Sequence, residues 1–199
     1  MKKRKTCEWP AGDDLMIKYH DTEWGVPADE DRKIFEFLVL ESAQAGLSWR
    51  TILHKRSGYK KAFANFDYKK VAKFNTKDVA RLIKNPDIIR NRLKIESTIN
   101  NAKRFLEVQK EFRSFSNYMW SFVNGKTIDG KRKTLKDLPA VTKESEIFAK
   151  DLKIRGFKFL GPTVIYAHMQ AVGMVNDHIT DCYRYKEIKN KKTISPLPS

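Results

Sequence analysis

Apolar residues recur at three- and four-residue spacing along most of this chain, and this periodicity is the feature that most restricts its fold. Ile34, Phe35 and Leu38 begin one such stripe, and Ile95 begins another within residues 91–112. This spacing places apolar side chains on one face of an α-helix. Strand-like alternation of apolar and polar residues is almost absent. The sequence therefore predicts an all-α fold, a compact domain of about eight to ten short helices.

Residues that cap or interrupt helices predict where these segments begin and end. Short polar side chains accept hydrogen bonds from the first free N–H groups of a helix, whereas glycine and proline interrupt it. The expected starts are Asp29, Ser48, Asp67, Thr76, Ser116, Thr142 and Gly161-Pro162, and the expected stops are Gly46, Pro86, Arg155 and Gly173. The segment from Asn124 to Arg132 is expected to be a loop or a short hairpin.

The charge of the chain points to a polyanionic partner. Lysine and arginine number 40 and aspartate and glutamate 24, which gives a formal net charge of +16. Nucleic acid is the first candidate and an anionic membrane the second. No apolar run is long enough to span a membrane, and no basic amphipathic helix has a long apolar face, so we expect no membrane partner. The basic start is not followed by an apolar stretch, so no secretion signal is expected.

The two ends of the chain differ in composition from its body. Residues 2–5 are all basic, and the residues from Lys186 onward are rich in lysine and contain proline. We expect a basic N-terminal tail over residues 1–6, one domain over 7–185, and a basic, proline-containing C-terminal tail over 186–199. Each tail could contact phosphates or could be an ordinary solvated segment.

The cysteine and histidine residues suggest a metal site. The chain has two cysteines and four histidines. His178 and Cys182 are four residues apart, so on a helix they would share one face. Twelve residues separate Cys7 from His20, and one short helix could bring them together. A set of two cysteines and two histidines would form a closed, structural zinc site. The spacing also allows both cysteines to be ordinary buried hydrophobic residues, and by itself it favours that alternative.

Glu41 is a carboxylate in an apolar setting. It follows Phe37-Leu38-Val39-Leu40, and a buried carboxylate needs a partner or a task. It could accept N–H groups at the turn near Gly46, form an ion pair, or face a ligand. Four aromatic residues lie in the same first quarter of the chain: Trp9, Tyr19, Trp24 and Trp49. Aromatic faces beside a carboxylate suit a flat, cationic or polar ligand, although each ring alone could be core.

A glycine-containing connection between two expected helices could contact phosphate. Gly156, Lys158 and Gly161 lie in this connection, which ends at a helix N-terminus. Glycine lets backbone approach a phosphate closely, and free N–H groups at a helix start favour an anion. A plain helix–helix turn is the alternative, and the net charge favours phosphate contact.

Taken together, these segments resemble bacterial DNA-3-methyladenine glycosylase I, in order over about residues 7–185. The resemblance is carried by Cys7-Glu8-Trp9, Tyr19 to Pro27, Leu40 to Trp49, Ile88 to Ile95, Trp120 to Val123, Arg155 to Gly161, Met169 to Gly173, Val175 to His178, and Cys182. The departures are the six residues before Cys7, the tail after Tyr185, and the segment near 126–136. They leave only local DNA contacts in doubt.

The resemblance implies the helix-hairpin-helix DNA glycosylase fold, with Gly156, Lys158 and Gly161 in the hairpin that contacts the DNA backbone. It also implies one structural zinc ion per chain, which joins the N- and C-terminal segments. The implied zinc ligands are Cys7, His20, His178 and Cys182. In the implied base pocket, Glu41 and Tyr19 hydrogen-bond the base, Trp49 stacks on it, and Trp9 lines the site.

The implied activity is base-excision repair of alkylated double-stranded DNA. The enzyme would flip out N3-methyladenine and hydrolyse its N-glycosidic bond. No lysine stands out as a Schiff-base nucleophile, so we expect a monofunctional hydrolase without strand cleavage. Asp177 lies beyond the hairpin, where relatives with this fold place a water-activating aspartate. We expect a monomer in the bacterial cytoplasm. The alternative is a zinc-stabilised, non-catalytic DNA-binding module.

Overall fold

The computed structural model describes residues 5–189, and within them the chain forms ten α-helices and almost no strand. The all-α prediction is therefore confirmed. The helices are α1 (Asp14–Thr22), α2 (Asp31–Gln44), α3 (Trp49–Ala62), α4 (Tyr68–Val71), α5 (Thr76–Leu82), α6 (Arg92–Phe112), α7 (Phe115–Ser121), α8 (Lys143–Ile154), α9 (Pro162–Ala171) and α10 (Tyr183–Lys189). Two 3₁₀ turns, η1 (Ala64–Phe66) and η2 (Leu135–Asp137), complete the helical elements of this part of the chain.

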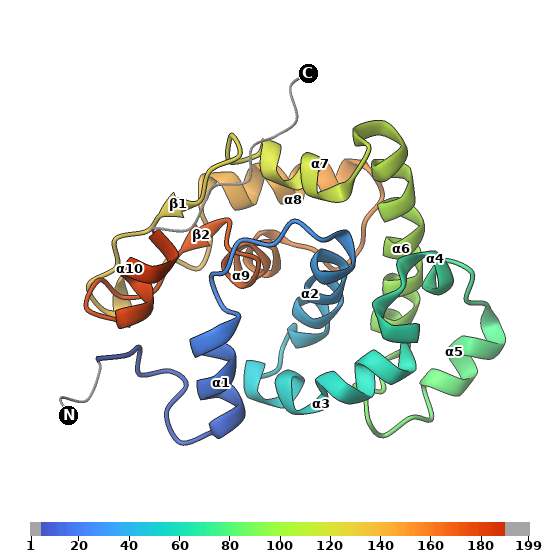
Figure 1. Cartoon of the computed structure of the whole chain (residues 1–199). Helices are drawn as coiled ribbons and strands as arrows, with labels where there is room; N and C mark the ends of the chain where they lie inside the picture. The colour runs from blue at the N-terminus through green and yellow to red at the C-terminus, as the bar shows by residue number, and fades with distance from the viewer. Residues whose placement is uncertain (1–4, 190–199) are drawn as a thin grey trace.

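Helix α2 lies at the centre of the molecule, and the other helices surround it (Figure 1). Nine of its side chains are buried, on more than one face of the helix. A helix that is apolar nearly all round is stable only when neighbours cover it. Here α3, α6, α7 and α9 provide that cover. Residues on α2 are therefore held from several sides, which suits a site that needs fixed geometry.

Local capping signals gave several helix boundaries correctly. The Ser48 side chain accepts a hydrogen bond from the Thr51 N–H (3.2 Å) and starts α3, as predicted. Thr142 caps α8 in the same way, through the N–H of Ser145 (3.3 Å). Asp67 caps α4. In each case the capping residue and its partner are within three residues, so sequence alone is sufficient.

Three predicted starts are displaced by one or two residues. The observed caps are Glu30 instead of Asp29, Asn75 instead of Thr76, and Ser114 instead of Ser116. At α7 the Ser114 side chain caps the helix locally, by accepting a hydrogen bond from the Asn117 N–H (3.0 Å), and α2 adds further contacts. The Asp31 carboxylate of α2 accepts hydrogen bonds from the N–H groups of Phe115 and Ser116, at 2.9 and 2.8 Å. These N–H groups are thereby satisfied from another helix, which local sequence does not reveal.

The segment from Asn124 to Arg132 is not a hairpin. Its strand β1 (Ile128–Asp129) pairs in parallel with β2 (Val175–Asn176), far away in sequence. The short-hairpin alternative is therefore wrong, and the loop alternative describes the rest of the segment. This pairing attaches the loop to the C-terminal part of the fold.

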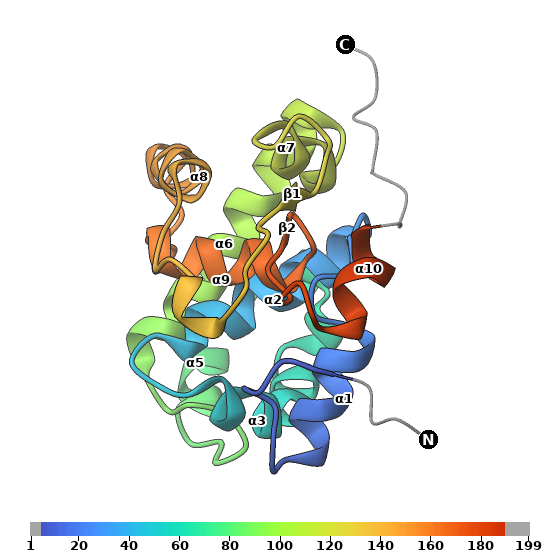
Figure 2. The same ribbon diagram turned by 90° about the vertical axis from the view of Figure 1, so that its left-hand side faces the viewer.

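The two ends of the described chain lie side by side, near α1 and α10 (Figures 1 and 2). The Lys5 ammonium pairs with Asp181 at 2.5 Å, and the Tyr183 N–H donates to the Lys5 carbonyl at 3.0 Å. Helix α10 continues to Lys189, which pairs with Asp129 at 3.0 Å. Of the predicted tails over residues 1–6 and 186–199, residues 1–4 and 190–199 lie outside the described residues, and the domain limits stay a prediction.

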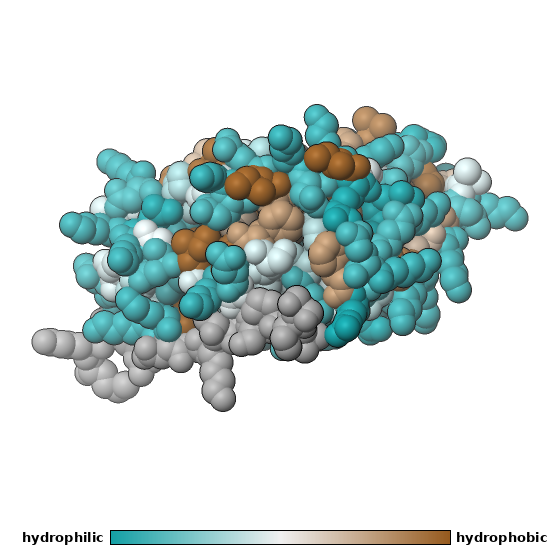
Figure 3. All heavy atoms as spheres, turned by 90° about the horizontal axis from the view of Figure 1, so that it is seen from above, coloured by the Kyte–Doolittle hydropathy of each residue, from teal (hydrophilic) through white to brown (hydrophobic). Residues whose placement is uncertain are grey.

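The surface is largely hydrophilic where α7 and α8 face outward, with separate apolar side chains among polar ones (Figure 3). Exposed apolar residues that are scattered singly are normal for a monomeric protein surface. Among the residues that the structure describes, no helix is long and apolar enough to cross a membrane.

Candidate active site

A hollow of about 250 Å³ lies against the central helix. Its lining residues come from segments far apart in sequence: Trp9, Tyr19, Trp24, Glu41, Gln44, Trp49, Leu135, Leu138, Ala167 and Gln170. All four residues expected in the base pocket are among them. The volume lies just below the range of about 300–1,000 Å³ that is common for drug-sized ligands, so it suits one flat heterocycle.

Glu41 is buried at the wall of this hollow without a partner. The residue is 4% exposed, and it makes no ion pair and no hydrogen bond to any residue between 5 and 189. The turn-acceptor and ion-pair alternatives are therefore both wrong. Burial raises the pKa of the Glu41 carboxyl to about 8. A buried, unpartnered acid in a pocket is typical of a group that waits for a ligand.

Aromatic rings enclose the space in front of Glu41. The ring centroids of Tyr19 and Trp49 are 5.1 Å apart, and those of Trp9 and Trp24 are 5.2 Å apart. The indole N–H groups of Trp9 and Trp49 are buried without a partner in the described chain. Burial, reinforced by the Glu41 carboxylate, raises the pKa of the Tyr19 hydroxyl well above its usual value. Tyr19 therefore stays protonated, and the hollow offers hydrogen-bond donors as well as one acid.

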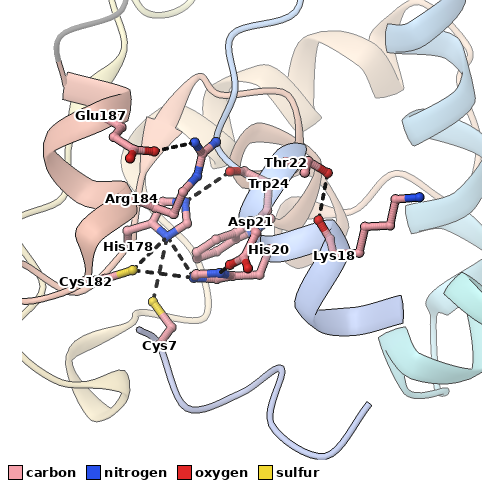
Figure 4. A network of polar contacts seen from close by, with 10 residues as sticks. All are labelled: Cys7, Lys18, His20, Asp21, Thr22, Trp24, His178, Cys182, Arg184 and Glu187. Carbon is pink, nitrogen blue, oxygen red and sulfur yellow. Dashed lines mark hydrogen bonds and ion pairs between the residues drawn. The ribbon is translucent and has the colours of Figure 1, made fainter. Parts of the chain in front are cut away.

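Cys7, His20, His178 and Cys182 form a buried cluster between the two ends of the fold, and Figure 4 shows them pointing toward one another. Their ligand atoms all lie within 4.8 Å of one another. The His178 Nδ1 lies 3.1 Å from His20 Nε2, 3.7 Å from Cys182 Sγ and 3.8 Å from Cys7 Sγ. Four such donors in this arrangement could hold a metal ion.

In each of the two histidines, the ring nitrogen that faces away from the cluster also has a polar partner. The Nδ1 of His20 lies 2.7 Å from the Asp21 carboxylate, and the Nε2 of His178 lies 3.1 Å from the Trp24 carbonyl oxygen (Figure 4). Metal-binding histidines usually donate their other ring N–H to a carboxylate or carbonyl in this way. The arrangement leaves His20 Nε2 and His178 Nδ1 free to face a metal.

The thiols differ in their affinity for protons. A hydrogen bond shared between the two cysteines lowers the pKa of Cys182 and raises that of Cys7. The pairing of His178 with Cys182 was predicted from helical spacing, but that reasoning is wrong. Both residues lie in the turn between β2 and α10, and the fold brings them together without a helix.

The connection between α8 and α9 is a compact hairpin on which Gly156, Lys158 and Gly161 lie. Gly156 has φ +82°, a conformation that favours glycine, and Gly161 is the N-cap of α9. The Lys158 side chain is exposed. The hairpin thus presents a basic side chain beside the free N–H groups of a helix start.

Two asparagines of α6 hold this hairpin. The Asn101 side chain accepts the Lys158 N–H and donates to the Lys158 carbonyl, both at 2.8 Å. Asn100 donates to the Gly156 carbonyl at 2.8 Å. Neither residue was predicted from the sequence. The available signal was a pair of asparagines inside a long helix, where their low helix propensity calls for a tertiary role.

The chain matches a known protein family over most of its length. The family model of methyladenine glycosylases matches residues 9–185. The chain belongs to the methyladenine glycosylase family. It is 45% identical over 179 residues to DNA-3-methyladenine glycosylase 1 of Escherichia coli, and this match covers 90% of the chain and 96% of that protein.

Solved structures of family members have the same fold. The 3-methyladenine DNA glycosylase I from Staphylococcus aureus is 37% identical with a TM-score of 0.89, over 96% of this chain and 99% of that chain. A variant of a 3-methyladenine DNA glycosylase I in complex with 3-methyladenine is 36% identical with a TM-score of 0.88, over 94% of this chain and 98% of that chain. The helix-hairpin-helix interpretation of this methyladenine glycosylase is therefore confirmed.

Asp177 does not face the hollow of this methyladenine glycosylase. Its side chain is fully buried and accepts hydrogen bonds from Arg132 (3.0 Å), Gln170 (2.8 Å) and Tyr166. With its oxygens engaged and no solvent access, it is not placed to activate water. The interpretation of Asp177 as a catalytic base is therefore not supported.

Several lining residues of this family member were not predicted from the sequence, namely Gln44, Leu135, Leu138, Ala167 and Gln170, whereas Trp24 was expected only as one of four aromatic residues near Glu41. Trp24 and Gln44 lie inside the segments that carry the family resemblance, which was an available signal. Leu135 comes from the segment near 126–136 that departs from the family pattern, and Leu138 lies just after it. No local feature of that segment indicates that it reaches the hollow.

Proposed function

We propose that this chain is a monofunctional DNA-3-methyladenine glycosylase, which binds alkylated double-stranded DNA and releases N3-methyladenine by hydrolysis. The observation that carries the proposal is Glu41, a buried acid without a partner, enclosed by aromatic rings in a hollow of one-base size. We further propose that it acts as a monomer in the bacterial cytoplasm.

The substrate explains why the site needs few catalytic groups. Methylation at N3 makes adenine cationic, so the bond between the sugar C1′ and the base N9 is already weak. When this bond breaks, its electron pair stays on the base, which leaves as a neutral molecule. Water adds to the electron-poor C1′ and loses a proton to solvent, which leaves an abasic site. The protein must mainly extrude the nucleotide, bind the cationic base and shield the reacting centre.

Glu41 would select the cationic base. A positive ring beside the buried carboxyl favours its ionised form and repays part of the cost of burying that charge. Neutral adenine gives no such compensation, so it would bind less well. The ionised Glu41 would also accept a hydrogen bond from the exocyclic amine. The carboxylate is therefore proposed as the main determinant of lesion recognition.

Aromatic residues would hold the base in place. A desolvated cation over an indole face is stabilised by about 2 kcal/mol. Trp49 would supply this stabilisation by stacking on the cationic base. Tyr19 would donate a hydrogen bond to the base, since its hydroxyl stays protonated. Trp9 would line the site, with an indole N–H that has no other described partner.

None of the lining residues is a lysine, so the hollow offers no amine for a Schiff base with the sugar. This supports a hydrolase that releases the base and leaves the strand intact. Gly156, Lys158 and Gly161 would contact the DNA backbone and orient the duplex, through backbone N–H groups and one exposed ammonium.

The metal is proposed to be one structural zinc ion per chain. Zinc bound tetrahedrally by two thiolates and two imidazoles requires sulfur–nitrogen separations of about 3.6 Å and a nitrogen–nitrogen separation of about 3.3 Å. Three of the four sulfur–nitrogen separations are 3.6 to 3.8 Å, the two nitrogens are 3.1 Å apart, and all four ligand atoms lie within 4.8 Å of one another. The residues present therefore fit zinc. When bound, it would join the two ends of the chain and stabilise the fold.

Base release distinguishes this activity from a non-catalytic DNA-binding module. Methylated duplex DNA is incubated with the protein, and the free bases are separated by chromatography. We expect free 3-methyladenine, with unbroken strands until alkali is added. Tight DNA binding without base release would refute the proposed activity and favour the binding module.

A further inference from the structure

One wall of the base pocket belongs to an irregular segment with little secondary structure of its own. Leu135 and Leu138 line the hollow from residues 130–138. The segment contains η2 and follows the two-residue strand β1. Most of the other lining residues lie on α1, α2, α3 or α9, and Trp9 and Trp24 lie outside the helices, before and after α1. An apolar wall of this kind excludes water only when something else holds it in position.

Arg132 attaches this segment to the C-terminal part of the fold. Its Nε lies 3.0 Å from Asp177 Oδ1, and a terminal nitrogen lies 3.4 Å from the Tyr166 hydroxyl. Its carbonyl accepts a hydrogen bond from the Thr180 N–H at 2.7 Å. The Asp177 side chain has no solvent exposure. Breaking a buried ion pair leaves an uncompensated charge, so this attachment is strong.

The backbone of the same segment closes tightly over Asp177. A Cβ atom placed on Gly130 would overlap Asp177 Oδ1. Gly130 also donates its N–H to the Asn176 carbonyl at 3.1 Å, next to the pairing of β1 with β2. No side chain fits at Gly130 unless the segment moves away. The segment is thus built to lie against Asp177.

Asp177 also fixes a second part of the pocket. The Gln170 amide donates its Nε2 to Asp177 Oδ2 at 2.8 Å. Only the NH₂ end of an amide can face a carboxylate, so the Gln170 oxygen turns the other way. Gln170 itself lines the hollow. Asp177 therefore contacts both Arg132, which attaches the apolar wall, and Gln170, a polar residue of the pocket.

We propose that the ion pair of Arg132 and Asp177 is a positioning device for the base pocket. It holds Leu135 and Leu138 against the extruded base and orients the Gln170 amide so that its oxygen is available to the ligand. Arg132 and Asp177 touch neither the base nor the sugar. This inference rests on the proposed function, because it assigns the occupant of the hollow as 3-methyladenine.

Binding of the free base tests the device without DNA contacts. Tryptophan fluorescence reports 3-methyladenine in a hollow that three tryptophans line. We expect Arg132→Gln to weaken binding about five- to tenfold while the metal content per chain stays unchanged. Arg132→Lys should recover part of the affinity, because an ammonium can still pair with Asp177. Leu138→Ala removes wall contact but keeps the ion pair, so it should weaken binding without a large loss of thermal stability.

Arg155→Gln is the matched control. Arg155 is also half-buried, at 25% side-chain exposure against 22% for Arg132, and binds a carboxylate, Asp151, at 2.6 Å. It does not line the hollow. We expect this variant to lose thermal stability and to bind the free base as the wild type does.

Wild-type affinity in Arg132→Gln or Leu138→Ala would overturn the positioning role, as would an equal loss in Arg155→Gln. A wild-type protein that does not bind 3-methyladenine would overturn the proposed function, and this inference with it. If the wild-type protein releases the base and the Arg132→Gln variant releases it at the same rate, the positioning role alone would be overturned.

Discussion

Replacing Glu41 with glutamine should stabilise the folded protein at alkaline pH while it slows base release. The folded state raises the pKa of the Glu41 carboxyl to about 8, from a usual value of 4.5. Between these values the unfolded chain has lost the proton and the folded protein has kept it. Ionisation therefore favours unfolding, and the free energy of unfolding falls as the pH rises through this range. A glutamine side chain carries no titrating proton, so the Glu41→Gln variant lacks this loss.

The size of this stability difference follows from the pKa of Glu41 in the unfolded chain and in the folded protein. These two values differ by about 3.5, and each unit corresponds to about 1.36 kcal/mol, so the complete effect is about 5 kcal/mol. At pH 5 little of it is present, because this pH lies only about half a unit above the pKa of the unfolded chain. From pH 5 to pH 9 the stability of Glu41→Gln relative to wild type should rise by about 4 kcal/mol. Other titrating groups are common to both proteins and cancel in the difference.

Urea unfolding at pH 5, 7 and 9, followed by circular dichroism, measures this difference. Glu36→Gln is the control on the same helix, since Glu36 is ion-paired with Arg56 at 2.8 Å. Removing a paired carboxylate should lower the stability at pH 7 rather than raise it. Single-turnover release of 3-methyladenine is measured in parallel. Glu41→Gln should release the base at least about tenfold more slowly, which is about 1.4 kcal/mol.

Two results would refute this reasoning. A stability difference that does not change with pH would mean that Glu41 is already ionised in the empty hollow, with a partner or with water. Unchanged base release together with a large loss of stability would make Glu41 a structural residue, and the base pocket would then have to lie elsewhere.

Three further predictions concern the rest of the site. Metal analysis should find one zinc ion per chain. Cys182→Ser or His178→Ala should lower the melting temperature strongly and slow base release only slightly, because the binding energy of a structural zinc is folding energy. Retained stability with lost turnover would point to a catalytic metal. Lys158→Ala should weaken binding to damaged and undamaged duplexes alike and reduce the slope of log affinity against log salt, measured by fluorescence anisotropy; a loss confined to damaged DNA would mean that Lys158 reads the lesion. Trp49→Ala should slow single-turnover base release through lost stacking while the salt dependence of DNA binding stays the same; a changed salt slope would place Trp49 at the DNA backbone instead.

The helical class and many helix boundaries could be predicted from the sequence, because those signals are local. Ser48 and Thr142 cap their helices through partners within three residues. The candidate base-contacting residues and the four candidate metal ligands were also identified from sequence, through residue type and family resemblance. The structure brings each group together, the first around one hollow and the second in one buried cluster.

The protonation and the spatial arrangement of these groups depend on tertiary contacts. Glu41 acquires its raised pKa because α2 is covered from several sides and offers the carboxyl no partner. His178 and Cys182 meet in a turn rather than on a helix. The wall residues Leu135 and Leu138 reach the hollow because Asp177 holds their segment through Arg132, which lies 45 positions earlier in the chain. Such contacts depend on long-range packing and buried charge, and local periodicity and capping patterns carry no information about them.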